Sequence, residues 1–359
     1  MAYRHRMAKY LGMVLFVSGS LILAVGLAGF TSGDNTSNQP VLLFGIGVHI
    51  EPFGAQVSPL AIAAGAVPRM LDPRQMDYNR RPDFERHVED LRNLAAVVES
   101  HHGLLTVQAQ TAFTTSAIRF GNTILSDFED NGHEIALHFH ENVHLGNDEE
   151  TLSPGLWTAV MQEEIDLIQR AGVENAIQYW SGGNLYPDVL QAAADAGLRI
   201  NSDWKDPSTQ STPQVLMGIH PWRPSGGTDG QDLSAFSVHD PQGEVIFLPG
   251  GIVDPVAFAN KNQIKAEEGL EGWLDVLEEA LQSSLAAARS DRVNVFHFTV
   301  HPGEFVDDPN DPYALLSDFI DDVIDPLVAQ GRIEWATFSQ MADAFESWEA
   351  EHPDTDPRS

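Results

Sequence analysis

The stretch Gly132–His144 reads GHEIALHFHENVH, and it decides how the rest of the chain is interpreted. It holds four of the chain's 14 histidines, and its apolar residues alternate with other residues, which predicts a β-strand. In such a strand His138 and His140 share one face, and His144 follows on the loop after the strand. Three imidazoles at this spacing indicate a metal site, because histidine is a common ligand of zinc and related ions. The alternative interpretation is a set of hydrogen-bonded core or surface histidines.

The composition narrows the class of protein. A chain of 359 residues with 43% hydrophobic content can form one large domain, or two small ones, with a sizeable core. The absence of cysteine excludes disulfides and thiolate zinc sites, so a metal would need His, Asp or Glu. A net charge of −32, from 52 acidic and 20 basic residues, argues against nucleic-acid binding. The same charge fits either adaptation to high salt or an ordinary acidic secreted protein.

Residues 1–30 have the pattern of an N-terminal membrane anchor or a signal peptide. Arg4, Arg6 and Lys9 precede Leu11–Phe30, an uncharged stretch that would span about 30 Å as a helix. The basic flank predicts that the rest of the protein lies outside the cytoplasm, either membrane-anchored or secreted. We expect residues 31–40 to be a polar linker, residues 41–350 to be the folded domain and residues 351–359 to be a frayed charged tail.

Strand and helix patterns alternate beyond residue 41, which predicts βα units and a parallel sheet or barrel. Besides the histidine strand, the expected strands are Val41–Ile50, Leu104–Gln108, Ala176–Trp180, Leu198–Trp204, Val245–Leu248, Val293–Val300 and Ile333–Ala336. The expected helices are Asp83–Ser100, Ala117–Asn131, Pro154–Ala171, Pro187–Ala196, Ala266–Arg289, Tyr313–Gln330 and Phe338–Glu349. His133 comes at or before the start of the histidine strand, so we expect it to make a structural hydrogen bond.

Chemically active side chains gather at or just past the C-terminal ends of the expected strands. His49 and Glu51 end the first strand, Trp180 to Asn184 and Asp203 follow later ones, and His301 to Glu304 follow the strand Val293–Val300. In a (β/α) barrel these ends form the active face. The shared position predicts one site, with Glu51 as the main partner of the histidines.

Several of these segments resemble the polysaccharide deacetylases, which are metal-dependent carbohydrate esterases with a NodB homology domain. GHEIALH looks like the family's second motif, and VLLFGIGVHIEP is similar to the first. YWSGGNLYPDVLQAAADAGLRINSDW resembles the third region, FTVHPGEF the late strand that ends in the catalytic histidine, and WATFSQMADAF the closing helix. The resemblance covers roughly Val41–Glu349 and implies a distorted (β/α) barrel of about seven parallel strands.

The resemblance also implies a function, namely metal-assisted removal of acyl groups from a glycan or an acylated small substrate. The implied ligands of a divalent metal, preferably zinc, are Glu51, His138 and His144, with His140 as a substitute for either histidine. The implied catalytic residues are His49 as base, His301 as acid and Glu304 as the residue that orients His301. The residues expected to line the substrate cleft are Trp180, Asn184, Asp203 and Trp204.

Two departures from the family pattern keep other functions open. The first motif usually carries two carboxylates, a base and then a metal ligand, whereas this chain has His49 and Glu51. An arginine common in the third region is replaced by Ser181-Gly182-Gly183. The alternatives are another metal-dependent amidohydrolase or a glycosidase on the same scaffold, or a catalytically inactive surface protein that binds glycan or metal.

Overall fold

The computed structural model describes residues 39–50, 60, 63, 77–138, 153–181, 189–202, 217–225, 236–306 and 310–359. Residues 1–38, with the anchor or signal peptide and most of the linker expected there, lie outside this set, so both remain predictions. Within the described residues, none of the helices has the length and apolar content that a bilayer span requires.

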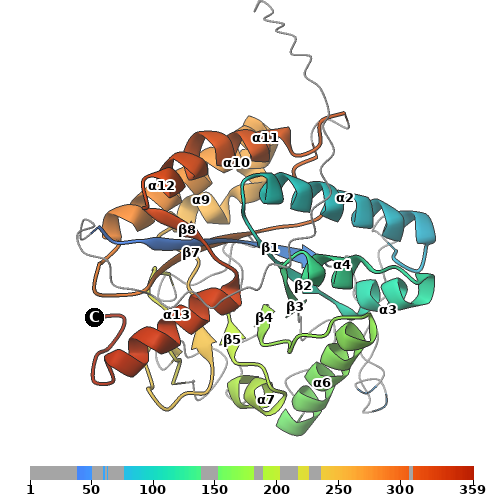
Figure 1. The fold of residues 1–359 in the computed structure, drawn as a ribbon, viewed down its shortest axis with the longest axis horizontal. Coiled ribbons are helices and arrows are strands. Elements are labelled where there is room, and N and C mark those ends of the chain that lie inside the picture. Colours follow the sequence, from blue (N-terminus) through green and yellow to red (C-terminus); the bar gives the residue numbers. More distant parts are fainter. Residues whose placement is uncertain are drawn as a thin grey trace, which may run out of the picture. The chain divides into compact units, whose positions relative to one another are not determined.

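A curled sheet of parallel strands forms the centre of the domain, in the order β6-β5-β4-β3-β2-β1-β7, with β8 also paired to β1 (Figure 1). The strands are β1 Leu42–Ile50, β2 Leu105–Ala109, β3 Glu134–His138, β4 Tyr179–Ser181, β5 Ile200–Asn201, β6 Ile246–Phe247, β7 Asn294–Val300 and β8 Ile333–Trp335. Every adjacent pair is parallel. This open, curled sheet agrees with the predicted distorted (β/α) barrel.

Helices follow most of the strands, as βα units require. They are α2 Arg81–Ser100, α3 Thr111–Phe120, α4 Ile124–Asp130, α6 Pro154–Arg170, α7 Val189–Asp195, α9 Pro255–Ala259, α10 Lys261–Ala287, α11 Ala314–Phe319, the π-helix η4 Ile320–Ile324, α12 Asp325–Ala329 and α13 Phe338–Glu351. Figure 1 shows α2 and α10 to α12 along one side of β1 and β7, with α13 on the other side.

The two faces of the sheet enter two different cores. In β1 the outward residues Phe44, Ile46 and Val48 pack in the large core under the surrounding helices. The opposite face packs in a smaller core that Phe338 and other residues of α13 fill. Side chains alternate along a strand, so each strand contributes to both cores. The helix α13 covers the inner face of the sheet.

Two expected helices are divided in the structure, for local reasons. The expected helix Ala117–Asn131 is instead α3 and α4, because Gly121 ends α3 in the left-handed conformation, with φ of 63°. The expected helix Tyr313–Gln330, for which Pro326 already predicted a bend or a division, is α11, η4 and α12 in succession. Pro326 lies in the first turn of α12 and cannot donate a backbone hydrogen bond, which matches the wider turn before it.

The expectation of a frayed tail at residues 351–359 is wrong. The guanidinium of Arg358 lies 4.0 Å from the centre of the Trp222 ring, and Arg358 also donates to the carbonyl of Ser237. The cation–π contact gives a charged tail residue a specific partner, since the ring of Trp222 is buried beneath it.

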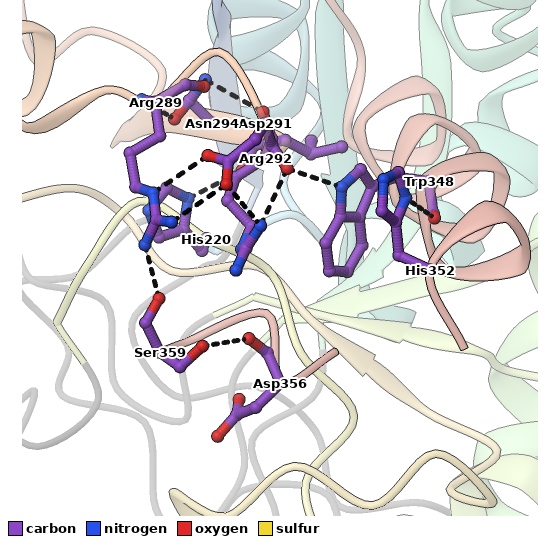
Figure 2. Close-up of polar contacts among 10 residues, drawn as sticks. His220, Arg289, Asp291, Arg292, Asn294, Trp348, His352, Asp356 and Ser359 are labelled. Carbon is purple, nitrogen blue, oxygen red and sulfur yellow. Dashed lines mark hydrogen bonds and ion pairs between the residues drawn. The ribbon is translucent and has the colours of Figure 1, made fainter. Parts of the chain in front are cut away.

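The turn that leads into β7 is tied to α13 by polar contacts (Figure 2). Asn294 donates to the backbone carbonyls of Val41 and Arg289, each at 2.9 Å. The indole of Trp348 on α13 donates to the carbonyl of Asp291 at 2.8 Å. These bonds fix the beginning of β7, the strand after which His301 follows.

Candidate functional site

Three histidines meet at the C-terminal ends of β1, β3 and β7. The rings of His49 and His138 are stacked, with centroids 3.9 Å apart and an interplanar angle of 26°. The ring of His301 meets His49 edge-on, with centroids 5.6 Å apart. His49 is 4% exposed and His138 is fully buried. Their positions at the strand ends predicted that these three residues lie close together, and the structure places them so.

Strand register explains why these rings meet. His49 pairs with Gln108 on β2, and Gln108 pairs with Ala136 on β3, so His138 lies one inward position further along. Paired residues of neighbouring parallel strands point to the same face. The small Ala136 leaves room beside Gln108, and the rings of β1 and β3 come together across β2.

Ser181 holds His138 in place. Its hydroxyl lies 2.7 Å from Nδ1 of His138, and both side chains are buried. Ser181 is also the register partner of His138 on β4. A histidine that binds a metal through one ring nitrogen usually has the other nitrogen in such a hydrogen bond. Ser181 occupies the region where the resembled family has an arginine, and no pattern in the sequence indicated a role for it.

Glu304 lies against His301. Its Oε2 accepts a hydrogen bond from the backbone N–H of His301 at 2.9 Å and lies 3.4 Å from Nδ1 of that ring. Lys261 and Lys265 of α10 contact Oε1, and the Lys261 distance is 3.2 Å. Burial alone would raise the pKa of the Glu304 carboxyl, but the hydrogen bond to His301 and the two lysine charges hold it well below its usual range. Glu304 is therefore a carboxylate at neutral pH.

His87 on α2 is a further histidine close to this group. Its Nδ1 lies 2.6 Å from the hydroxyl of Tyr78, and its side chain is buried. Burial and the positive charges of Arg86 and His301, against the opposing charge of Asp83, lower the pKa of His87 to about 4. His87 is therefore neutral at neutral pH.

Gln108, the register partner of His49 on β2, has a fully buried polar side chain. A Cβ added to Gly47 would meet the Nε2 of Gln108 at 2.6 Å, so the amide lies directly over this glycine. Neither amide atom has a hydrogen-bond partner in the described part of the chain. Gly47 thus provides space that any larger residue would take from Gln108.

Two predictions about single residues have clear outcomes. His133 accepts a hydrogen bond from the backbone N–H of Leu105 at 3.0 Å, which confirms its structural role. Trp180 as a substrate platform is wrong, because it is 1% exposed and packs in the large core. In a strand of three residues, Trp180 points away from the face that carries Ser181.

Six predicted site residues fall outside the described residues, so their roles stay predictions. They are Glu51, His140, His144, Asn184, Asp203 and Trp204. Among the described residues, one group of possible metal ligands lies elsewhere, formed by His101, Asp321 and Asp325. Nδ1 of His101 already contacts Asp325 at 2.9 Å, and its Nε2 lies 3.4 Å from Ser317. These bonds account for the group as contacts between the end of α2 and the η4–α12 segment.

The fold of this chain is similar to the folds of several solved structures. A probable polysaccharide deacetylase from Pseudomonas aeruginosa matches with a TM-score of 0.54 and 15% identity, over 88% of this chain and 93% of that chain. Puue allantoinase matches with a TM-score of 0.53 and 15% identity, over 93% of this chain and 100% of that chain. No protein-family model and no curated protein matches the sequence. The resemblance to polysaccharide deacetylases is therefore confirmed in the fold, of which this chain is a divergent example.

Proposed function

We propose that this protein is a metal-dependent hydrolase that removes acyl groups from a glycan or an acylated small substrate. The observation that carries the proposal is the meeting of His49, His138 and His301 at the rim of the sheet. The fold shared with a probable polysaccharide deacetylase supports the same class of chemistry. We also propose that the domain works outside the cytoplasm, because residues 1–30 have the pattern of an anchor or signal peptide.

The donor set of the chain fits a divalent metal, preferably zinc. His138 is buried, and Ser181 holds its Nδ1, as expected of a ligand with an outer-shell partner. Its proposed co-ligands Glu51 and His144, with His140 able to replace either histidine, lie outside the described residues. When bound, such an ion polarises an acyl carbonyl and lowers the pKa of water.

The remaining histidines supply the proton transfers. His49 accepts a proton from the attacking water, since imidazole, with a pKa of about 6.5, is a competent base near neutral pH. His301, in its imidazolium form, gives the proton on Nε2 to the leaving nitrogen or oxygen and keeps the proton on Nδ1. Glu304 contacts the backbone N–H and the Nδ1 of His301 and so holds the ring in place. The edge-on contact of His49 and His301 lets both rings serve one acyl group.

Metal analysis of the purified protein, combined with acetate release from acetylated oligosaccharides, tests the proposal. We expect a bound divalent ion and acetate release that chelation abolishes. His138→Ala should lose the metal, and His301→Gln should keep the metal and lose acetate release. His102→Asn is the matched control, because this histidine is exposed and lies at the end of α2. Retention of metal by His138→Ala would contradict the ligand assignment.

The second candidate is a protein that binds glycan or metal at the cell surface without hydrolysis. The observation that favours it is His49, which stands where the family has a carboxylate and stacks on His138. Metal and glycan binding without acetate release would support this candidate. Release of ammonia or of a reducing sugar from other substrates would instead support an amidohydrolase or a glycosidase.

A further inference from the structure

Lys261 and Lys265 form an unusual pair at the start of α10. Only four lysines occur in the chain, against 52 acidic residues, yet two of them contact the single carboxylate of Glu304. The Lys261 side chain is 6% exposed and that of Lys265 18% exposed. The pair therefore lies inside the protein rather than on a solvated face.

The position of the pair is unfavourable in three ways. The N-terminal end of a helix carries a partial positive charge, which disfavours cations. Like charges four residues apart on a helix repel each other. Burial lowers the pKa of Lys265, the charge of Glu304 opposes that shift, and the charge of Lys261 adds to it. Only specific partners offset such costs, and among the described residues the anionic partner is Glu304.

Aromatic rings hold the two ammonium groups. Lys261 Nζ lies 5.1 Å and Lys265 Nζ 5.5 Å from the ring centre of Trp273, and Lys265 also lies 5.9 Å from that of Phe305. Cation–π contacts of this kind fix the direction of an otherwise flexible side chain. The lysines thus present a rigid positive surface to Glu304.

The two oxygens of Glu304 have separate tasks. Oε1 contacts the lysines, and Oε2 faces the backbone N–H and Nδ1 of His301. A carboxylate without the lysines would be a buried, poorly paired charge, and such a group takes up a proton. A protonated carboxyl can donate to Nδ1, whereas a carboxylate can only accept from it. The lysines therefore decide which nitrogen of His301 carries the proton.

We propose that Lys261 and Lys265 are positioning residues for His301, which keep Glu304 ionised and fixed so that His301 has its proton on Nδ1 when neutral. Nε2 of His301 is then directed to the substrate side. This inference rests on the proposed function only for its catalytic meaning, since the arrangement of the side chains exists without substrate. Among the described residues, the other charged or titratable groups near His301 include His49 on β1, His87 and Asp90 on α2, and Tyr313 before α11.

NMR of protein with ¹⁵N-labelled histidine rings tests the proposal without any substrate. The His301 signals are assigned by their loss in His301→Gln. In the unmodified protein, at a pH where His301 is neutral, we expect the proton on Nδ1. In Lys265→Met, and more completely in Lys261→Met/Lys265→Met, we expect the proton to move largely to Nε2. Lys265→Arg should retain the original tautomer, because it keeps the charge.

Two further variants control for a general effect of losing a cation and for a variant that does not fold. Arg81→Met removes a cation from an exposed i,i+4 pair with Glu85 and should leave the His301 signals unchanged. If the double methionine variant does not fold, Lys265→Met/Glu304→Gln replaces it, because this variant removes one charge of each sign. His301 should then show a mixture of both tautomers. An unchanged Nδ1–H tautomer in Lys265→Met and in this double variant would overturn the proposal. Failure of acetate release with the expected tautomers would instead refute the proposed function alone.

Discussion

His87 should make the protein lose stability as the pH falls below about 6.5. Its pKa is lowered to about 4 in the folded protein, whereas an unfolded histidine has a pKa of about 6.5. The unfolded chain therefore binds this proton first, so folding stability falls as the pH decreases from 6.5 towards 4. A full difference of 2.5 pKa units corresponds to about 3 kcal/mol, of which about 2 kcal/mol is lost by pH 5.

The perturbation is His87→Gln, which removes the titration and keeps an acceptor for the hydroxyl of Tyr78. Urea unfolding curves at pH 7.5 and pH 5 give the free energy of unfolding for both proteins. The unmodified protein should lose about 2 kcal/mol more than the variant between these pH values. His102→Asn, on the surface, should behave like the unmodified protein. Equal losses in His87→Gln and the unmodified protein would refute the assignment of a neutral, buried His87.

Three other predictions concern the site and its support. Gly303 has φ of 79° and approaches a carboxylate of α2, so Gly303→Ala should lower the free energy of unfolding by more than the roughly 1–2 kcal/mol of backbone strain. Gly121, with φ of 63°, has open space around it, so Gly121→Ala measures the backbone strain alone. Thermal melting of both variants gives the comparison. Ser181→Ala should weaken metal affinity about 10- to 100-fold by freeing Nδ1 of His138, and unchanged affinity in a chelator competition would count against that role. Phe338→Ala should destabilise the domain by about 3–5 kcal/mol, measured by urea unfolding, because Phe338 is fully buried in the inner core.

The sequence predicted the part of the site that depends on local patterns. The two-residue period of the strands and the places where they end put His49, His138 and His301 on one rim, as the structure has them. Trp180 was misassigned although the same period applies, because a strand of three residues is too short for the sequence to reveal its phase.

Other parts could not be predicted because they arise from packing between distant segments. Lys261 and Lys265 reach Glu304 from a helix that precedes β7, and no spacing in the sequence connects them. The contact of Arg358 with Trp222 likewise depends on where the tail crosses the protein. The sequence also does not predict that the side-chain amide of Gln108 lies over Gly47 without a hydrogen-bond partner among the described residues.

The pairing of β1 has a consequence for how the protein is made. Leu42 pairs with Asn294 on β7 and with Ile333 on β8, so this strand, although it can pair early with β2, must wait for two partners that are synthesised much later. Until then its apolar residues, including Phe44 and Ile46, have an incomplete surface to pack against. A nascent chain can therefore complete this part of the sheet only after β7 and β8 have been synthesised, and until then one edge of β1 has no backbone partner from them.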